Sequence, residues 1–326
     1  MALAVLGGTM VSAQSRINGE LAGRLHNSVA AAVISFGSGL LLLTVAVCAF
    51  RPAREGLDRL RQLLGKGDVR WWECAGGACG AFFVATQGIT VGSLGVAVFI
   101  VSFVAGQSVS SLLVDRAGLA PGGPRPITPG RAIGTGLAVV AVLLTVSGRI
   151  GTPAALGLAL LPVLAGFGST WQTAMNGRVR EATTGVMATT WVNFAVGTAA
   201  LLAVLGVQLL FTGTGGTTRP LPGALPSEPW LYVGGALGIV FIAAAAALVR
   251  HIGVLLLGLS MIAGQVGGAV VIDAIAPGSA GRPSAVTVIG ALLTLVAVGI
   301  AALASGRPST SAPPSPPAPP SMSARS

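Results

Sequence analysis

The chain has 326 residues, of which 53% are hydrophobic and only 9% are charged, and its mean hydropathy is +0.84. Soluble domains carry about 25% charged residues, so this composition excludes a soluble globular enzyme and predicts an all-α polytopic membrane protein. The net charge of +10 comes from basic residues spread between apolar segments rather than gathered on one face, which excludes nucleic acid as the expected partner.

Ten apolar segments follow one another along the chain. A helix needs about 20 apolar residues to cross the ~30 Å hydrocarbon core of a bilayer. The two shortest gaps, at 88–92 and 248–253, predict tight helical hairpins, and 51–70 is expected to be a loop. The predicted spans are 2–20, 27–50, 71–90, 93–114, 131–149, 153–175, 185–211, 229–249, 252–273 and 284–304.

An internal repeat relates the two halves of the chain at one ungapped offset of 158 residues. Because each copy has an odd number of spans, the second copy must enter the membrane in the opposite orientation. We therefore expect two inverted five-helix repeats, 1–150 and 151–304, followed by a disordered Pro/Ser-rich tail, 305–326. The matches include Gly8 with Gly166, Gln14 with Gln172, Asn18 with Asn176, Phe36 with Phe194, Gly95 with Gly253, Gln107 with Gln265 and Asp115 with Asp273.

The basic residues test this topology independently. With a cytoplasmic N-terminus, 14 of the 19 Lys and Arg residues fall on the cytoplasmic side. The two equivalent long connections differ most, because 51–70 carries six of these residues and 212–228 carries one. The positive-inside rule therefore predicts cytoplasmic N and C termini and a plasma-membrane location.

All nine acidic residues lie in loops or at span ends, so no carboxylate is expected at the bilayer centre. A permanent cation would need such a carboxylate, and a neutral, zwitterionic or anionic solute is therefore favoured. No metal, cofactor or nucleophile–base pattern is present in the sequence, and the three cysteines fit no metal-ligand spacing, so we expect no enzyme activity.

Neutral polar residues occupy the middle of the spans, and they could either contact a solute or join helices by hydrogen bonds worth ~0.6–2 kcal/mol. Under the inverted topology they converge on the midplane at the repeat interface, where transporters of this kind bind substrates. Trp171 could stack on a solute or fill the core. Asp115 and Asp273 could be gating residues or solvated helix ends, with Arg116 as a partner for Asp115. The candidate binding residues are Gln14, Asn18, Ser35, Gln107, Trp171, Gln172, Asn176, Asn193 and Gln265.

A family resemblance follows from the stretches Gly7-Gly8 to Gln14-Ser15-Arg16-Ile17-Asn18-Gly19 and Ser35-Phe36-Gly37-Ser38-Gly39, each with a counterpart in the second half. These residues resemble the drug/metabolite transporter superfamily, specifically its YdcZ-type branch, over residues 3–303. The resemblance implies a five-plus-five inverted repeat in the bacterial inner membrane that exports small solutes. Small multidrug members use a mid-membrane Glu in the first helix. Gln14 and Asn18 stand in that region here, which argues against cation export by that mechanism.

We therefore expect a secondary transporter of a small metabolite that works by alternating access, surrounded by lipid and able to form a homodimer. A passive channel would need a continuous polar stripe along one pore. A non-transporting scaffold or sensor would have a tightly packed interior without a cavity. Both alternatives stay open at the level of the sequence.

Overall fold

The computed structural model describes residues 1–119, 123–124, 126–147, 153–212 and 225–305, and within these residues it is helical without strands. Two short 3-10 helices, η1 and η2, precede α4 and α9. The elements are α1 (Ala2–Leu25), α2 (Ser28–Ala49), α3 (Arg51–Lys66), η1 (Trp71–Ala75), α4 (Gly76–Leu94), α5 (Val96–Arg116), α6 (Pro129–Ser147), α7 (Pro153–Thr183), α8 (Val186–Thr212), η2 (Pro229–Tyr232), α9 (Gly234–Ile275) and α10 (Ala285–Ser305).

Local capping explains the first connection. His26 ends α1 in the left-handed conformation, with φ of 52°. Asn27 then begins α2, because its side-chain oxygen accepts a hydrogen bond from the Ala30 N–H at 2.9 Å. An Asn side chain in this position satisfies one of the four free N–H groups at a helix start.

The turn between α4 and α5 lies later than the sequence suggested. The predicted gap at 88–92 is wrong, because α4 continues to Leu94 and only Gly95 separates it from α5. Gly95 has φ of +83°, a conformation that glycine adopts without strain. Gly88 remains inside α4, where a Cβ would lie 2.8 Å from the Ala22 Cβ, so this glycine serves close packing rather than a turn.

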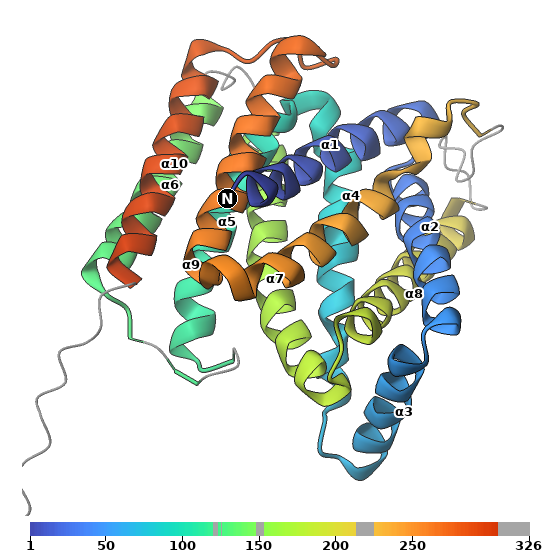
Figure 1. Ribbon diagram of the computed structural model, residues 1–326. Helices are drawn as coiled ribbons and strands as arrows, with labels where there is room; N and C mark the ends of the chain where they lie inside the picture. The colour runs from blue at the N-terminus through green and yellow to red at the C-terminus, as the bar shows by residue number, and fades with distance from the viewer. Residues whose placement is uncertain (120–122, 125, 148–152, 213–224, 306–326) are drawn as a thin grey trace, which may run out of the picture.

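The second predicted hairpin also differs from the structure. The segment expected to hold two spans, 229–249 and 252–273, forms one continuous helix, α9, after the short η2. Figure 1 shows the orange α9 ribbon changing direction along its length rather than running straight. The absence of proline and the run of alanines within 234–275 favour unbroken helical hydrogen bonding.

The expected loop 51–70 contains an amphipathic helix, α3. Its buried residues Ala53, Gly56 and Leu60 recur at helical spacing, and its other residues include exposed arginines. A Cβ on Gly56 would lie 2.8 Å from the Thr183 carbonyl oxygen, so α3 packs closely against the end of α7. Hydropathy alone missed this helix because its apolar residues occupy only one narrow stripe.

Seven of the described helical segments are long and apolar enough to cross a membrane. The helices α1 and α7 are not among these seven, and they carry the amides Gln14, Asn18, Gln172 and Asn176. The arrangement of ten spans in two repeats remains a prediction. The structure supports a multi-pass helical protein in which α1 packs against α4 and α9, and α7 packs against α4 and α5.

The two halves of the chain interlock. Helix α1 packs mainly against α9, and α7 packs mainly against α4 and α5. Helices α6 and α10 lie side by side at one edge of the bundle (Figure 1). We call the two ends of the bundle the α3 end, at the bottom of Figure 1, and the α5 start, where α5 begins.

Glycines at equivalent positions make equivalent close approaches between helices. A Cβ on Gly106 would overlap the Val163 carbonyl, and a Cβ on Gly264 would overlap the Val5 carbonyl. These two contacts are related by the 158-residue offset. The same relation holds for Gly8 against Met261 and Gly166 against Phe103. Small residues thus let the helices of one half approach those of the other at matching depths.

Candidate solute-binding cavity

A central cavity of about 170 Å³ lies between seven helices of the two halves. Its wall combines side-chain amides with phenylalanine rings, and the lining contains no charged side chain. The lining residues are Val11, Gln14, Phe36, Gly80, Phe83, Val84, Phe103, Gln107, Ser169, Gln172, Thr173, Asn176, Asn193, Phe194, Gly238, Phe241, Ile242 and Gln265.

Most of this lining is made of position pairs related by the 158-residue offset. A cavity whose wall repeats in this way lies on the interface between the two halves, to which each half contributes residues at equivalent positions. The pairs are Val11 with Ser169, Gln14 with Gln172, Phe36 with Phe194, Gly80 with Gly238, Phe83 with Phe241, Val84 with Ile242, and Gln107 with Gln265.

The amides of α1 and α7 are held differently in the two halves. Gln172 and Asn176 both donate to the Asn193 side-chain oxygen, at 2.8 and 3.2 Å. Ser35 occupies the equivalent position in α2 and is shorter. Gln14 therefore donates to the Gly234 carbonyl at 2.9 Å instead.

The amides of Gln107 and Gln265 retain free hydrogen-bonding capacity. Gln265 is 5% exposed, and its Oε1 has no hydrogen-bond partner although it is buried. Gln107 Nε2 makes only a long contact of 3.5 Å with Ser169 Oγ. Buried polar atoms are normally paired, so an unpaired amide oxygen on the wall of a cavity is a candidate ligand contact.

Three predicted binding residues do not line this cavity. Asn18 donates to Gln87 Oε1 at 2.6 Å, and Ser35 is 2% exposed without a hydrogen bond from its Oγ. Trp171 packs against the apolar cluster that contains Val114 and Met175. The interpretation of Trp171 as core filling fits this placement better than stacking on a solute.

Gln87 is a buried polar residue that the sequence interpretation did not include. It is fully buried, accepts from Asn18 and donates to Ser15 Oγ at 2.9 Å. The 158-residue offset places Ala245 at its equivalent position, so the repeat comparison could not mark it. The predicted span ended at residue 90, so Gln87 stood beside the expected turn rather than in the middle of a helix.

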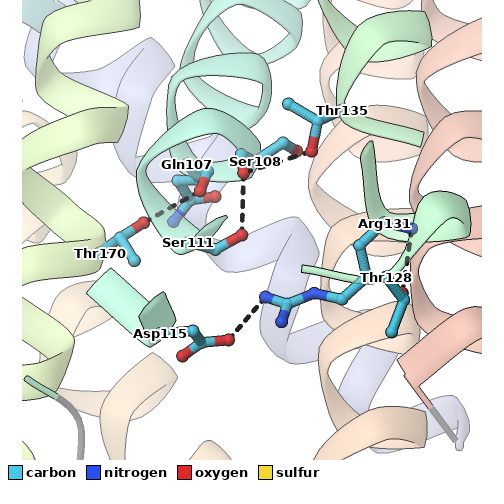
Figure 2. Close-up of polar contacts among 8 residues, drawn as sticks. All are labelled: Gln107, Ser108, Ser111, Asp115, Thr128, Arg131, Thr135 and Thr170. Carbon is cyan, nitrogen blue, oxygen red and sulfur yellow. Dashed lines mark hydrogen bonds and ion pairs between the residues drawn. The ribbon is translucent and has the colours of Figure 1, made fainter. Parts of the chain in front are cut away.

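A second hollow of about 460 Å³ lies between α5, α6, α7, α9 and α10 on the α3 side of the cavity and shares Gln107 and Thr173 with it. Figure 2 shows its polar wall. The Thr170 hydroxyl donates to the backbone carbonyl of Gln107, and the hydroxyls of Thr135 and Ser111 donate to the backbone carbonyl of Ser108. The central cavity is thus continued by polar groups toward the α3 end.

Asp115 lies near this hollow and pairs with Arg131 of α6 at 2.5 Å (Figure 2). The partner expected from the sequence, Arg116, is therefore wrong. Adjacent residues of a helix do not face each other, whereas the start of α6 places Arg131 opposite Asp115. Both residues of this pair belong to the first half of the chain.

Asp273, the equivalent of Asp115, ties the two halves together at the α5 start. Its side-chain oxygens accept the backbone N–H groups of Val96 at 3.1 Å and Ala97 at 2.8 Å. The side chain is buried, at 4% exposed, and a Cβ on Gly95 would lie 2.9 Å from its Oδ2. A carboxylate at a helix N-terminus satisfies free N–H groups and interacts favourably with the helix dipole.

Ion pairs join the halves at both ends of the bundle. Arg178 contacts Glu73 at 2.9 Å at the α3 end, and Arg24 contacts Glu228 at 2.6 Å at the α5 start. The pKa of the Glu228 carboxyl lies below its ordinary value of 4.5, first because its own backbone N–H donates to it and second because Arg24 does. Its stabilisation is therefore present above the unfolded-state pKa and lost as the pH falls through the folded-state pKa, and it is small because the pair is exposed.

Comparison with known proteins identifies the family. The model of the YdcZ family of drug/metabolite transporters, described as "Putative inner membrane exporter, YdcZ", matches residues 1–144 and again residues 157–300. No curated protein matches the chain. The two matches start 156 residues apart, close to the repeat offset seen in the sequence. The chain therefore belongs to the YdcZ family of inner-membrane exporters, as the resemblance of its amide and glycine motifs implied.

Proposed function

We propose that this protein is a secondary transporter that exports a small metabolite by alternating access, with the central cavity as its binding site. The observation that carries the proposal is the cavity itself, whose lining pairs equivalent residues of the two halves. In transporters built from inverted repeats, the substrate site lies at the repeat interface near the bilayer midplane. The twofold family match supports the same division of the chain into repeats.

The orientation follows from charge. The α3 end carries the cluster of arginines in 51–70, so the positive-inside rule places this end, and both termini, in the cytoplasm. The hollow next to Gln107 then continues the cavity toward the cytoplasm, while Asp273 closes the outer end. This state suits loading of a solute from the cytoplasm, as an exporter requires.

Asp273 and Asp115 are proposed as the two gating residues. In the present state Asp273 holds the start of α5, and Asp115 is paired within its own half. We propose that these roles exchange in the outward-open state. Asp273 releases α5, α9 breaks at residues 254 and 255, which correspond to the start of α5, and Asp115 leaves Arg131 to cap the helix start formed there. A closed end in every state distinguishes this carrier from an open pore.

The double variant Gln107→Leu with Gln265→Leu tests the binding site. Leucine nearly preserves volume but removes both amides, so we expect solute export from proteoliposomes to fall to the level of empty liposomes. The assay measures loss of a bacterial metabolite extract from the lumen by mass spectrometry. Gln62→Leu on the exposed face of α3 is the matched control and should export normally.

Folding of the double variant is checked by its yield and elution from a sizing column. Export by a well-folded double variant at the wild-type rate would remove these two amides from the site. Absence of export by the wild-type protein itself, with every solute of the extract retained, would contradict the transporter proposal.

A further inference from the structure

The charge of the cavity restricts its ligand. None of the residues that line it is charged, and the nearest ion pair in the adjoining hollow, Asp115 with Arg131, is already neutralised. Transferring an unpaired charge from water into such a site is costly. A zwitterionic or anionic solute would find no counter-charge among the described lining residues, so an uncharged solute fits best.

The side-chain amides of Gln107 and Gln265 restrict the hydrogen-bonding groups that a ligand can carry. Each Gln side chain offers an N–H donor and a C=O acceptor side by side. Gln265 Oε1 is buried without a donor, and Gln107 Nε2 has only its long contact with Ser169. A ligand that carries an adjacent donor and acceptor of its own would satisfy these amides. Carboxamides, lactams and nucleobase edges all have this pattern.

The phenylalanine side chains of the cavity wall restrict the shape of the ligand. Phe36 and Phe194 lie with ring centroids 4.9 Å apart, and Phe83 and Phe103 lie 4.5 Å apart. Phe241 completes this apolar side of the cavity. Aromatic rings prefer offset or edge-to-face contact with other rings, so this wall favours a flat ring over a branched aliphatic group.

The volume of the cavity restricts the size of the ligand. The cavity measures about 170 Å³. Pockets for drug-sized ligands measure about 300–1,000 Å³. The cavity is large enough for a single ring system, and a longer ligand would extend into the adjoining hollow beside Gln107 and Thr173.

We propose that the solute of this cavity is an uncharged, planar molecule of one ring system that carries an amide-type donor–acceptor edge. This inference rests on the proposed function, because it assigns the substrate class of the same site. Gln265 and Gln107 bind the polar edge, and the phenylalanine wall contacts the ring face.

Three probe molecules test separately whether the charge and the shape of a ligand determine its binding. Benzamide has the proposed features, benzoate replaces its amide with a carboxylate, and cyclohexanecarboxamide keeps the amide but loses the flat ring. Binding to the purified full-length protein is measured by isothermal titration and by the shift in Tm, which rises when a ligand binds only the folded state. We expect benzamide to bind at least tenfold more tightly than either of the other two.

Gln265→Leu should weaken benzamide binding at least tenfold, whereas Gln62→Leu should leave it unchanged. Because Gln265 Oε1 has no partner, leucine at this position should not lower the Tm of the free protein. Benzoate or cyclohexanecarboxamide binding as tightly as benzamide would overturn the inference. No benzamide binding up to its solubility, or unchanged benzamide binding by Gln265→Leu, would overturn it as well.

The export assay distinguishes this inference from the proposed function. Export of anions that Gln107→Leu with Gln265→Leu abolishes would overturn the uncharged class and leave the transporter in place. Selective benzamide binding without export of any solute would overturn the transporter proposal and leave the proposed ligand class in place.

Discussion

Asp273→Ala is expected to open the outer end of the bundle and to abolish net export. The substitution removes the acceptor of two buried N–H groups at the start of α5. Loss of a helix cap and of a buried hydrogen bond costs about 2 kcal/mol. If that energy is specific to the outward-closed state, the equilibrium shifts about 30-fold toward the open one.

The rate of thiol labelling at two introduced cysteines measures this shift. Each is introduced into a variant of the protein from which the three natural cysteines have been removed. Ala269→Cys lies one turn before Asp273 and is fully buried, so a water-soluble thiol reagent should reach it only in the outward-open state. Ser111→Cys lines the hollow on the α3 side and should be reached in the present state. Asp273→Ala should speed labelling at position 269 and slow it at 111.

Asp115→Ala is the matched control, and it should not shift the equilibrium toward the outward-open state. It removes the present ion pair with Arg131 and also the proposed contact of the outward-open state, so labelling should remain fast at 111 and slow at 269. Asp273→Asn should restore part of the closure, because an amide oxygen still accepts a hydrogen bond. Equal labelling changes in Asp273→Ala and Asp115→Ala would show that these carboxylates only support the fold.

Gly106→Ala and Gly264→Ala are each expected to destabilise the fold strongly. A Cβ at either position would overlap a backbone carbonyl of the opposing helix, which cannot move without separating the two halves. Overpacking of this kind costs about 1–3 kcal/mol. Thermal unfolding of the purified protein measures the loss, and the two variants should lose similar amounts because their contacts are equivalent.

Gly136→Ala in α6 is the control for the loss of glycine itself. No atom lies within 4 Å of a Cβ built there. Alanine in a helix is favoured over glycine by about 0.5–1 kcal/mol, so this variant should be as stable as the wild type or more stable. A loss of stability equal to that of Gly106→Ala would contradict the close-packing account.

The helical class, the family and the position of the amides could be predicted from the sequence, because hydropathy and an ungapped repeat are strong signals. Six of the nine candidate binding residues line the central cavity: Gln14, Gln107, Gln172, Asn176, Asn193 and Gln265. Their role in binding remains a proposal. The repeat placed them because equivalent residues of the two halves line one cavity.

Features that depend on local backbone geometry or on packing between distant helices could not be predicted. Glycines occur throughout the apolar segments, so nothing in the sequence distinguished the turn at Gly95 from the packing at Gly88. The pairing of Asp115 with Arg131 depends on where α6 begins relative to α5. Gln87 lacks a repeat partner, and its contacts with Asn18 and Ser15 are visible only when α1 and α4 are packed.

The central claim is that the two halves are inverted in the membrane, and sided cysteine labelling tests it most directly. Val69 and Ser227 are equivalent positions of the repeat, each shortly before a 3-10 helix. In cells that express single-cysteine variants, a membrane-impermeant maleimide should label Ser227→Cys in intact cells and Val69→Cys only after permeabilisation. Labelling of both positions from the same side would contradict the inverted repeat and, with it, the shared cavity and the exchange of gates.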